Sequence, residues 1–293
     1  MLVGMPSNQE VNTMAILDTF YRFLSLAFVL ATIISTGLSL TLTQIIRPLR
    51  NLRFVTIALL ANFVLVPAAA YILIQGFSLD ESLASGLLLV SLAAGAPGLP
   101  KLAELAKADL AEAIGLMVLL LVVTIIILPV ALPILITGIS VTFWDIASGL
   151  VFLILIPLAL SLFVRARYQQ FALTTQPYFV KASNYSLVGL IVLMVVLNFS
   201  NLLDLLGSGG LPASLILVIV SLVGGYLLGS LGGFDKLVQA FGAGQRNIAA
   251  AMVVATMNFG DDVVVIVIVY SLIALIIMIP WSIGLGKRAN KPA

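Results

Sequence analysis

Long apolar runs constrain the fold of this chain more than any other feature. About nine such runs, each of about 20 residues or more, lie between short segments that hold most of the charges. This is the length that a transmembrane α-helix needs, whereas strands of a membrane barrel are roughly ten residues long and alternate in polarity. Only 9% of the residues are charged, compared with roughly one quarter in soluble domains. We therefore predict an all-α, polytopic membrane protein.

The charged segments between the apolar runs give the boundaries of the predicted spans. The nine predicted spans are residues 22–46, 52–75, 82–106, 109–137, 143–164, 182–203, 211–232, 236–257 and 263–285. Residues 1–293 are then a single transmembrane domain. Residues 168–181 are more polar than their surroundings, and we expect them to form an interfacial linker between two bundles.

Positive charge alternates between successive loops and sets the orientation in the membrane. Lysine and arginine gather in every second loop and in the C-terminal tail, and short cytoplasmic loops carry such an excess. The residues are Arg47, Arg50, Arg53, Arg165, Arg167, Lys181, Lys236, Lys287, Arg288 and Lys291. The N-terminus and the opposite loops hold mainly aspartate and glutamate. We therefore expect the N-terminus outside and the C-terminus in the cytoplasm.

The chain contains no cysteine and no histidine. Thiolate chemistry, histidine acid–base catalysis and the common zinc sites are therefore excluded, so we expect no catalytic residue, no metal site and no enzyme activity. A membrane-embedded enzyme is the least favoured alternative, because only serine–lysine or carboxylate pairs remain for it. We also expect no nucleic-acid partner, since the basic residues already fit the loops of a membrane protein.

The eighth predicted span carries the polar sequence GAGQRN at residues 242–247. An arginine at the centre of the bilayer costs roughly 2.5 to 3.5 kcal/mol on an insertion scale, so such a residue usually faces a cavity, a pathway or a partner. We predict that Gly244, Gln245, Arg246 and Asn247 belong to a substrate-binding site. The alternative is a helix-packing surface of small residues with polar contacts, which explains the neighbouring alanines but not the arginine.

The third predicted span carries a second polar segment, GAPGLPK. Its two prolines each remove a backbone donor and its glycines relax the backbone, which predicts an interrupted helix with free backbone groups. Pro97, Gly98 and Lys101 are the predicted substrate-binding residues of this segment. Glu104 lies at the spacing of an ion pair with Lys101 and is an ion-binding candidate. The alternative is a helix that ends at the cytoplasmic surface.

The two polar segments indicate an inverted repeat. Each leads through an aspartate into an apolar run that ends at a proline, from Asp109 to Pro129 and from Asp261 to Pro280. The third and eighth spans are five apart, so the two copies cross the membrane in opposite directions, as in transporters built from inverted halves. The predicted repeats cover residues 20–137 and 140–286, and one peripheral helix is absent from the first.

Two interrupted helices that meet near the midplane would create a positively charged site. The N-termini of the half-helices contribute partial charges, and Lys101 and Arg246 contribute full ones. Asn62 and Thr124 are further polar candidates within spans. We therefore predict a secondary active transporter of a small organic anion, with the lipid bilayer as its surroundings. The alternative is a passive anion channel, which would require a polar lining along several spans.

At these residues the chain resembles the bile acid:sodium symporter family. The resemblance rests on the RPLR loop followed by NFVLVP, on APGLPK leading to an Ala-Lys-Ala-Asp turn, and on GxGQRN in the eighth span. It implies core and panel domains, two discontinuous helices that cross near the bilayer centre, and alternating access. It also implies carboxylate, sulfonate or bile-acid-like substrates carried with sodium. We expect a multi-pass protein of a bacterial inner (plasma) membrane.

The chain departs from the family pattern at the positions that bind sodium in relatives. Sodium-coupled members are expected to have Glu-x-Gly-x-Gln-Asn at the second crossing. In this chain Gly242 stands in place of the glutamate and Arg246 in place of the glutamine. Asn62 and Asn247 match the ion-binding positions that persist. We predict that Lys101 and Arg246 take the electrostatic role of bound sodium, and that transport is sodium-independent and needs no cofactor.

A rival hypothesis is proton coupling through carboxylates near the first polar segment. The candidates are Glu104, Asp109 and Glu112, which are the carboxylates nearest to that segment in the sequence.

Overall fold

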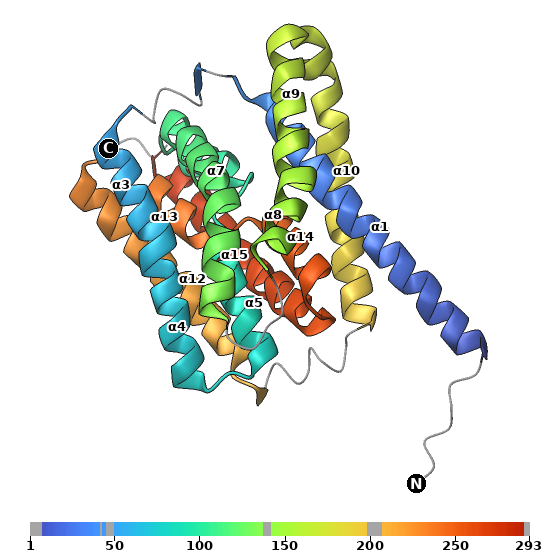
Figure 1. Ribbon diagram of the computed structural model, residues 1–293. Helices are drawn as coiled ribbons and strands as arrows, with labels where there is room; N and C mark the ends of the chain where they lie inside the picture. Colours follow the sequence, from blue (N-terminus) through green and yellow to red (C-terminus); the bar gives the residue numbers. More distant parts are fainter. Residues whose placement is uncertain (1–7, 42, 45–49, 137–141, 198–206, 290–293) are drawn as a thin grey trace.

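A computed structural model describes residues 8–41, 43–44, 50–136, 142–197 and 207–289. Long helices make up most of this part of the chain, and no β-strand occurs within it (Figure 1). The predicted all-α class is therefore confirmed. Arg47 and Asp204, two of the charges that bear on the orientation, lie outside the described residues.

The helices follow one another with short connections. Their bounds are α1 (Asn8–Ser39), α3 (Leu52–Leu60), α4 (Val66–Phe77), α5 (Glu81–Leu92), α6 (Leu99–Ala106), α7 (Leu110–Leu135), α8 (Phe143–Leu150), α9 (Ile156–Arg167), α10 (Gln169–Leu197), α12 (Gly210–Gly232), α13 (Lys236–Gly244), α14 (Ile248–Asn258) and α15 (Asp261–Ala289). The π-helical turns η1 (Ala61–Leu65) and η2 (Val151–Leu155) join α3 to α4 and α8 to α9. A proline follows each π-turn by two residues, and its missing N–H accounts for the local change in hydrogen-bond register.

Six helical segments in the described part are long and apolar enough to cross a membrane. They are Thr19–Ser39, Leu52–Phe77, Leu110–Leu135, Phe143–Arg167, Gly210–Gly232 and Asp261–Ala289. Large apolar side chains on these helices, such as Ile72, Ile126 and Ile276, are exposed, as expected where a helix faces lipid. These segments coincide with six of the predicted spans and confirm a polytopic membrane protein.

The helices form two groups that are joined by α14. In one group α1 packs lengthwise against α9 and α10, which stand apart from the other helices in Figure 1. In the other group α12 packs against α4, α13 and α15, while α15 also contacts α5 and α6. Helix α14 contacts α1 as well as α15 and therefore lies where the groups meet. Helix α7 packs against α5, α6 and α13 and belongs to the same second group. Tyr270, Phe241 and Leu116, on α15, α13 and α7, are among the largest fully buried side chains.

The linker predicted at residues 168–181 differs from the structure. Helix α10 begins at Gln169 and continues past Pro177, so that only Tyr168 separates it from α9. The polar residues of this stretch are accommodated in the exposed first half of the helix. For example, the hydroxyls of Thr174 and Thr175 donate to carbonyls one turn earlier. Polar composition alone does not distinguish such a helix from a linker.

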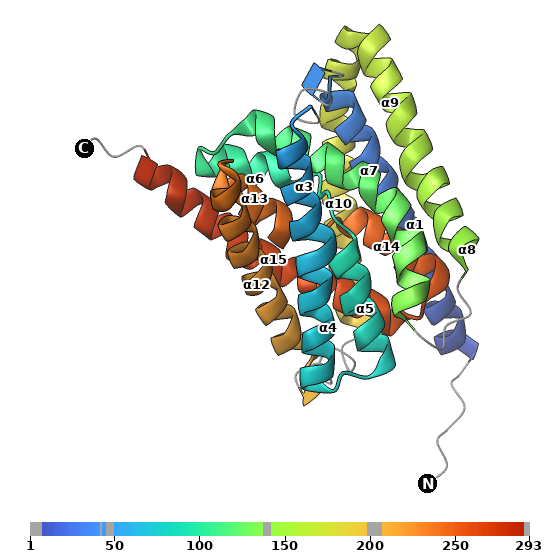
Figure 2. The same cartoon turned by 60° about the vertical axis from the view of Figure 1, so that its left-hand side comes forward.

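Both interruptions predicted from glycine and proline are present. Residues 93–98 separate α5 from α6, and residues 245–247 separate α13 from α14. The second halves of the two interrupted helices, α6 and α14, lie in different parts of the molecule. Helix α6 lies beside α13, whereas α14 extends toward α1 (Figure 2). The Thr124 hydroxyl of α7 bonds both the N–H and the carbonyl of Ala94, at 3.0 and 3.1 Å, and thus holds the first interruption against α7.

Gly95 is the residue in the first interruption that most clearly requires glycine. Its φ is +79°, and a Cβ there would lie 2.2 Å from the backbone nitrogen of Leu121. We predict that Gly95→Ala lowers the stability by about 2 kcal/mol or more, because the left-handed conformation and the backbone clash both penalise a side chain. The apparent melting temperature of the purified protein in detergent should fall by roughly 5 °C or more.

Gly284→Ala is the matched control for this substitution. Gly284 lies in α15, and a Cβ there meets nothing within 4 Å. The melting temperature of the Gly284→Ala variant should equal that of the wild-type protein or be slightly higher, since alanine favours the helix. Equal melting temperatures for the two variants would show that the first interruption does not depend on Gly95.

Candidate functional site

The two interruptions contact each other directly, and we refer to this contact as the crossing. Asn247 forms most of it: its backbone N–H donates to the Ala93 carbonyl at 2.7 Å, and its side-chain amide donates to the Gly95 carbonyl at 3.2 Å. The Asn247 side-chain oxygen also accepts from the N–H of Ala250 and caps α14. The crossing therefore satisfies backbone groups that both interruptions would otherwise leave unpaired.

Arg246 lies at the crossing and is buried, with 3% of its surface exposed. One guanidinium nitrogen donates to the Ser91 carbonyl at 3.3 Å, and another donates to the Ala243 carbonyl. The Tyr270 phenol lies beside the guanidinium and donates to the Gly244 carbonyl at 2.9 Å. Within the described residues no carboxylate bonds to Arg246, and its Nε has no partner.

Lys101 lies in the first turn of α6, the half-helix that follows the first interruption. Its ammonium pairs with the Glu104 carboxylate at 2.8 Å, and both side chains are largely exposed. The ion pair expected from the three-residue spacing is therefore present. The αL conformation of Lys107 ends α6, and Asp109 then caps α7 through its side chain.

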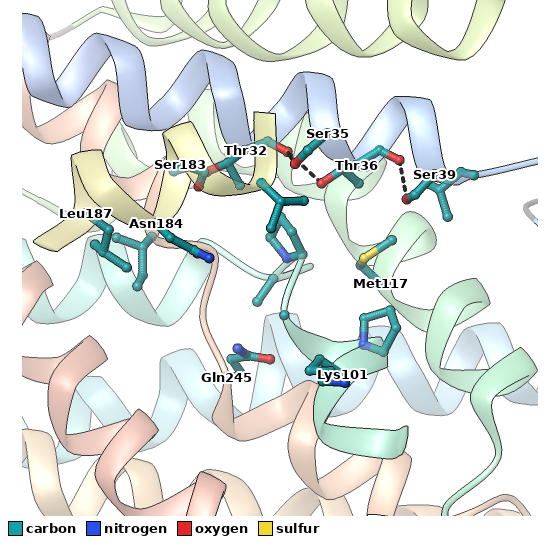
Figure 3. A pocket seen from close by; sticks show the side chains of 18 of the residues that line it. Thr32, Ser35, Thr36, Ser39, Lys101, Met117, Ser183, Asn184, Leu187 and Gln245 are labelled. Carbon is teal, nitrogen blue, oxygen red and sulfur yellow. Dashed lines mark hydrogen bonds between the residues drawn. The ribbon is translucent and has the colours of Figure 1, made fainter. Parts of the chain in front are cut away.

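A cavity of about 790 Å³ lies between the crossing and the group formed by α1 and α10 (Figure 3). This volume falls within the range of roughly 300–1,000 Å³ that is usual for small-molecule sites. Pro97, Gly98, Lys101, Gln245 and Arg246 line it from the crossing side. Gln245 packs so closely on Gly98 that a Cβ there would lie 2.5 Å from the Gln245 side-chain nitrogen.

A row of hydroxyls lines the opposite wall of the cavity. Thr32, Ser35, Thr36 and Ser39 of α1 all face it, and Figure 3 shows them along one side of that helix. The hydroxyls of Ser35, Thr36 and Ser39 each donate to a carbonyl one turn earlier, at 2.7 to 2.9 Å. Each hydroxyl proton is thus bonded to the backbone, and the hydroxyl oxygen keeps lone pairs that can accept a hydrogen bond from a ligand.

Helix α10 adds further polar groups to this hydroxyl wall. Ser183 and Asn184 line the cavity, and the hydroxyls of Ser183 and Thr32 lie 2.6 Å apart. The site predicted from the sequence lacks the residues of this wall. The signal that could have found them is the spacing of the four α1 hydroxyls at i, i+3, i+4 and i+7, which places them on one helix face.

The structure places the predicted site residues in three different surroundings. Five of the seven predicted substrate-binding residues line the cavity, together with Glu104. Gly244 and Asn247 are buried in the crossing and do not line it. Asn62 is fully buried in η1, away from the cavity lining, where its amide donates to the Ala58 carbonyl and its side-chain oxygen has no partner among the described residues.

The other two carboxylates of the proton-coupling hypothesis tie two helix ends together. The N–H of Asp109 donates to the Asp235 carboxylate at 2.7 Å, and the N–H of Asp235 donates to the Glu112 carboxylate at 2.9 Å. Asp235 also caps α13. Neither Asp109 nor Glu112 lines the cavity, whereas Glu104 does.

Comparison with known proteins identifies the family of the chain. The model of the sodium bile acid symporter family matches residues 26–205, more than half of the 293 residues. The match begins within α1, includes the first interruption and ends before the second one, which holds Arg246. No curated protein matches the chain. Members of the family are transporters and not enzymes. Because this match covers more than half of its residues, the chain belongs to the sodium bile acid symporter family.

Proposed function

We propose that this protein is a secondary transporter of a small organic anion and that it works by alternating access. The observation that carries the proposal is the cavity between the crossing and the hydroxyl wall, which holds cationic side chains at one side. Sites of this kind, formed where discontinuous helices meet, are typical of secondary transporters. Membership of a transporter family supports the same conclusion.

The proposed topology has nine spans and an inverted repeat. The uninterrupted candidate spans account for six, and α10 and the pairs α5–α6 and α13–α14 would supply the others. In support of the repeat, each interrupted pair precedes a long helix, α7 or α15, that has an aspartate at its N-terminal end and a proline in its second half. The charges of the loops support an orientation with the N-terminus outside and the C-terminus in the cytoplasm.

The two groups of helices supply the proposed moving parts. Helices α1, α8, α9 and α10 would form a panel domain, and the remaining helices would form the core domain with the crossing. The cavity lies between them and has residues of both groups in its walls. A change in the relative position of the two domains would therefore open the cavity to one side of the membrane and then to the other.

The two walls indicate which part of a substrate each would contact. Lys101 and the side chain of Gln245 suit a carboxylate or sulfonate, because both can donate hydrogen bonds to an anion. The hydroxyl wall suits a body that carries hydroxyl groups of its own, since its oxygens keep acceptor capacity. A hydroxylated or bile-acid-like carboxylate would contact both walls.

A neutral substitution of Lys101 tests the anion-binding role. Purified protein is first screened by thermal shift against bile acids and small carboxylates, and the stabilising anion is then used in proteoliposome uptake. We predict that Lys101→Gln raises the KM for this anion by roughly two- to fivefold, because a partly exposed charge contributes modestly to binding. Lys107→Gln is the matched control and should leave KM unchanged, since Lys107 does not line the cavity.

Two results of this assay would contradict the proposal. An unchanged KM for Lys101→Gln would remove that residue from the site. Uptake that increases in proportion to the gradient without saturation would indicate a pore.

A cysteine on the hydroxyl wall tests whether the substrate occupies the cavity. The natural chain has no cysteine, so any reaction with a thiol reagent comes from the introduced residue. We predict that the anion slows the reaction of Thr36→Cys with a hydrophilic maleimide, because Thr36 lines the cavity. Gln170→Cys, on the exposed first turn of α10, should react equally with and without the anion. Equal slowing at both positions would instead indicate a global change.

A further inference from the structure

The crossing brings the C-terminal ends of two half-helices close to one buried cation. Ser91 lies in the last turn of α5 and Ala243 in the last turn of α13, and Arg246 donates to the carbonyls of both. The carbonyls at the end of a helix have no partner within it and carry a partial negative charge. In transporters with broken helices such carbonyl ends can coordinate a cation taken from solution.

The guanidinium supplies that positive charge from the chain itself. Two of its nitrogens donate to carbonyls, its Nε has no partner among the residues that the structure describes, and the side chain is almost completely buried. Arg246 nevertheless lies in the wall of the cavity. An ion from the cavity that reached these carbonyls would therefore meet a position already filled by a charge that cannot dissociate.

We propose that Arg246 is a covalently attached counter-cation of the crossing, and that it occupies the position of a monovalent cation that would otherwise have to bind and leave in each transport cycle. Lys101 does not take part in this role, because its ammonium is exposed and pairs with Glu104. The inference rests on the proposed transport function and adds that transport of the anion needs no co-transported sodium.

The hydrogen bonds also commit part of the Arg246 guanidinium to the backbone rather than to the substrate. An arginine that binds a carboxylate normally presents two N–H groups to it in a fork. Here the groups that bond Ser91 and Ala243 are directed to the backbone instead. These two N–H groups are therefore not available to the anion, and we expect Arg246 to act on it mainly through its charge and through the shape of the crossing.

Removal of the guanidinium provides the test, because it leaves the carbonyls free for an added cation. Uptake of the stabilising anion is measured in sodium, lithium, choline and millimolar guanidinium salts. Wild-type uptake should be equal in sodium and choline. For Arg246→Ala, uptake in choline should fall at least tenfold and should recover several-fold when sodium or guanidinium is added. Lys101→Ala is the control, and added cations should not restore its uptake.

Three outcomes would overturn the inference. These are wild-type uptake that rises steeply with sodium but not with lithium or choline, Arg246→Ala uptake equal to wild type in choline, and a folded Arg246→Ala variant that no cation restores. If Arg246→Ala does not fold, Arg246→Lys replaces it and should transport equally in sodium and choline. Sodium dependence of Arg246→Lys uptake would count against the inference.

A measurement without transport keeps this test separate from the proposed function. The melting temperature of Arg246→Ala should rise by several degrees with millimolar guanidinium chloride relative to choline chloride, and that of wild type should not. If no anion is taken up by wild type but this shift is observed, the proposed function fails while the cation position stands. If the shift is absent, the cation position itself is excluded.

Discussion

The hydrogen bonds between the two interruptions are the interaction on which the rest of the structure depends. Backbone N–H and C=O groups cannot remain unpaired in the hydrocarbon region, so one interrupted helix alone would be costly. Here each interruption supplies partners for the other through Asn247 and Arg246, and Thr124 of α7 holds the first one from the opposite side. The arrangement makes the two halves of the chain interdependent, because neither crossing segment is satisfied without its counterpart.

The parts of the site that could be predicted from the sequence are those in which a helix-breaking or charged residue stands within an apolar span. Pro97 and Gly98 in an apolar span indicated an interrupted helix, and Arg246 in another span indicated a buried charge with a function. The spacing of Lys101 and Glu104 gave their ion pair. These features are local, and the chemistry of the side chains involved has few alternatives in a membrane.

The remaining parts depend on contacts that leave little trace in the sequence. The partners of Arg246 are backbone carbonyls, which every residue has, so no sequence pattern identifies Ser91 and Ala243. The α1 hydroxyls resemble ordinary serines and threonines of membrane helices, which often bond their own backbone. The first half of α10 was interpreted as a linker, because its polarity fits an exposed helix and a connecting segment equally well. Tertiary packing decides each of these cases.

The separate origin of the two cavity walls bears on how such a protein can diversify. The hydroxyl wall belongs to α1 and α10, which make no hydrogen bond to the crossing among the described residues. Changes in the size or polarity of its side chains would alter the fit of a ligand without disturbing the backbone pairing between the interruptions. In the proposed transporter, the range of anions that bind can therefore change through substitutions on α1 and α10, while the hydrogen bonds that hold the two interrupted helices together stay as they are.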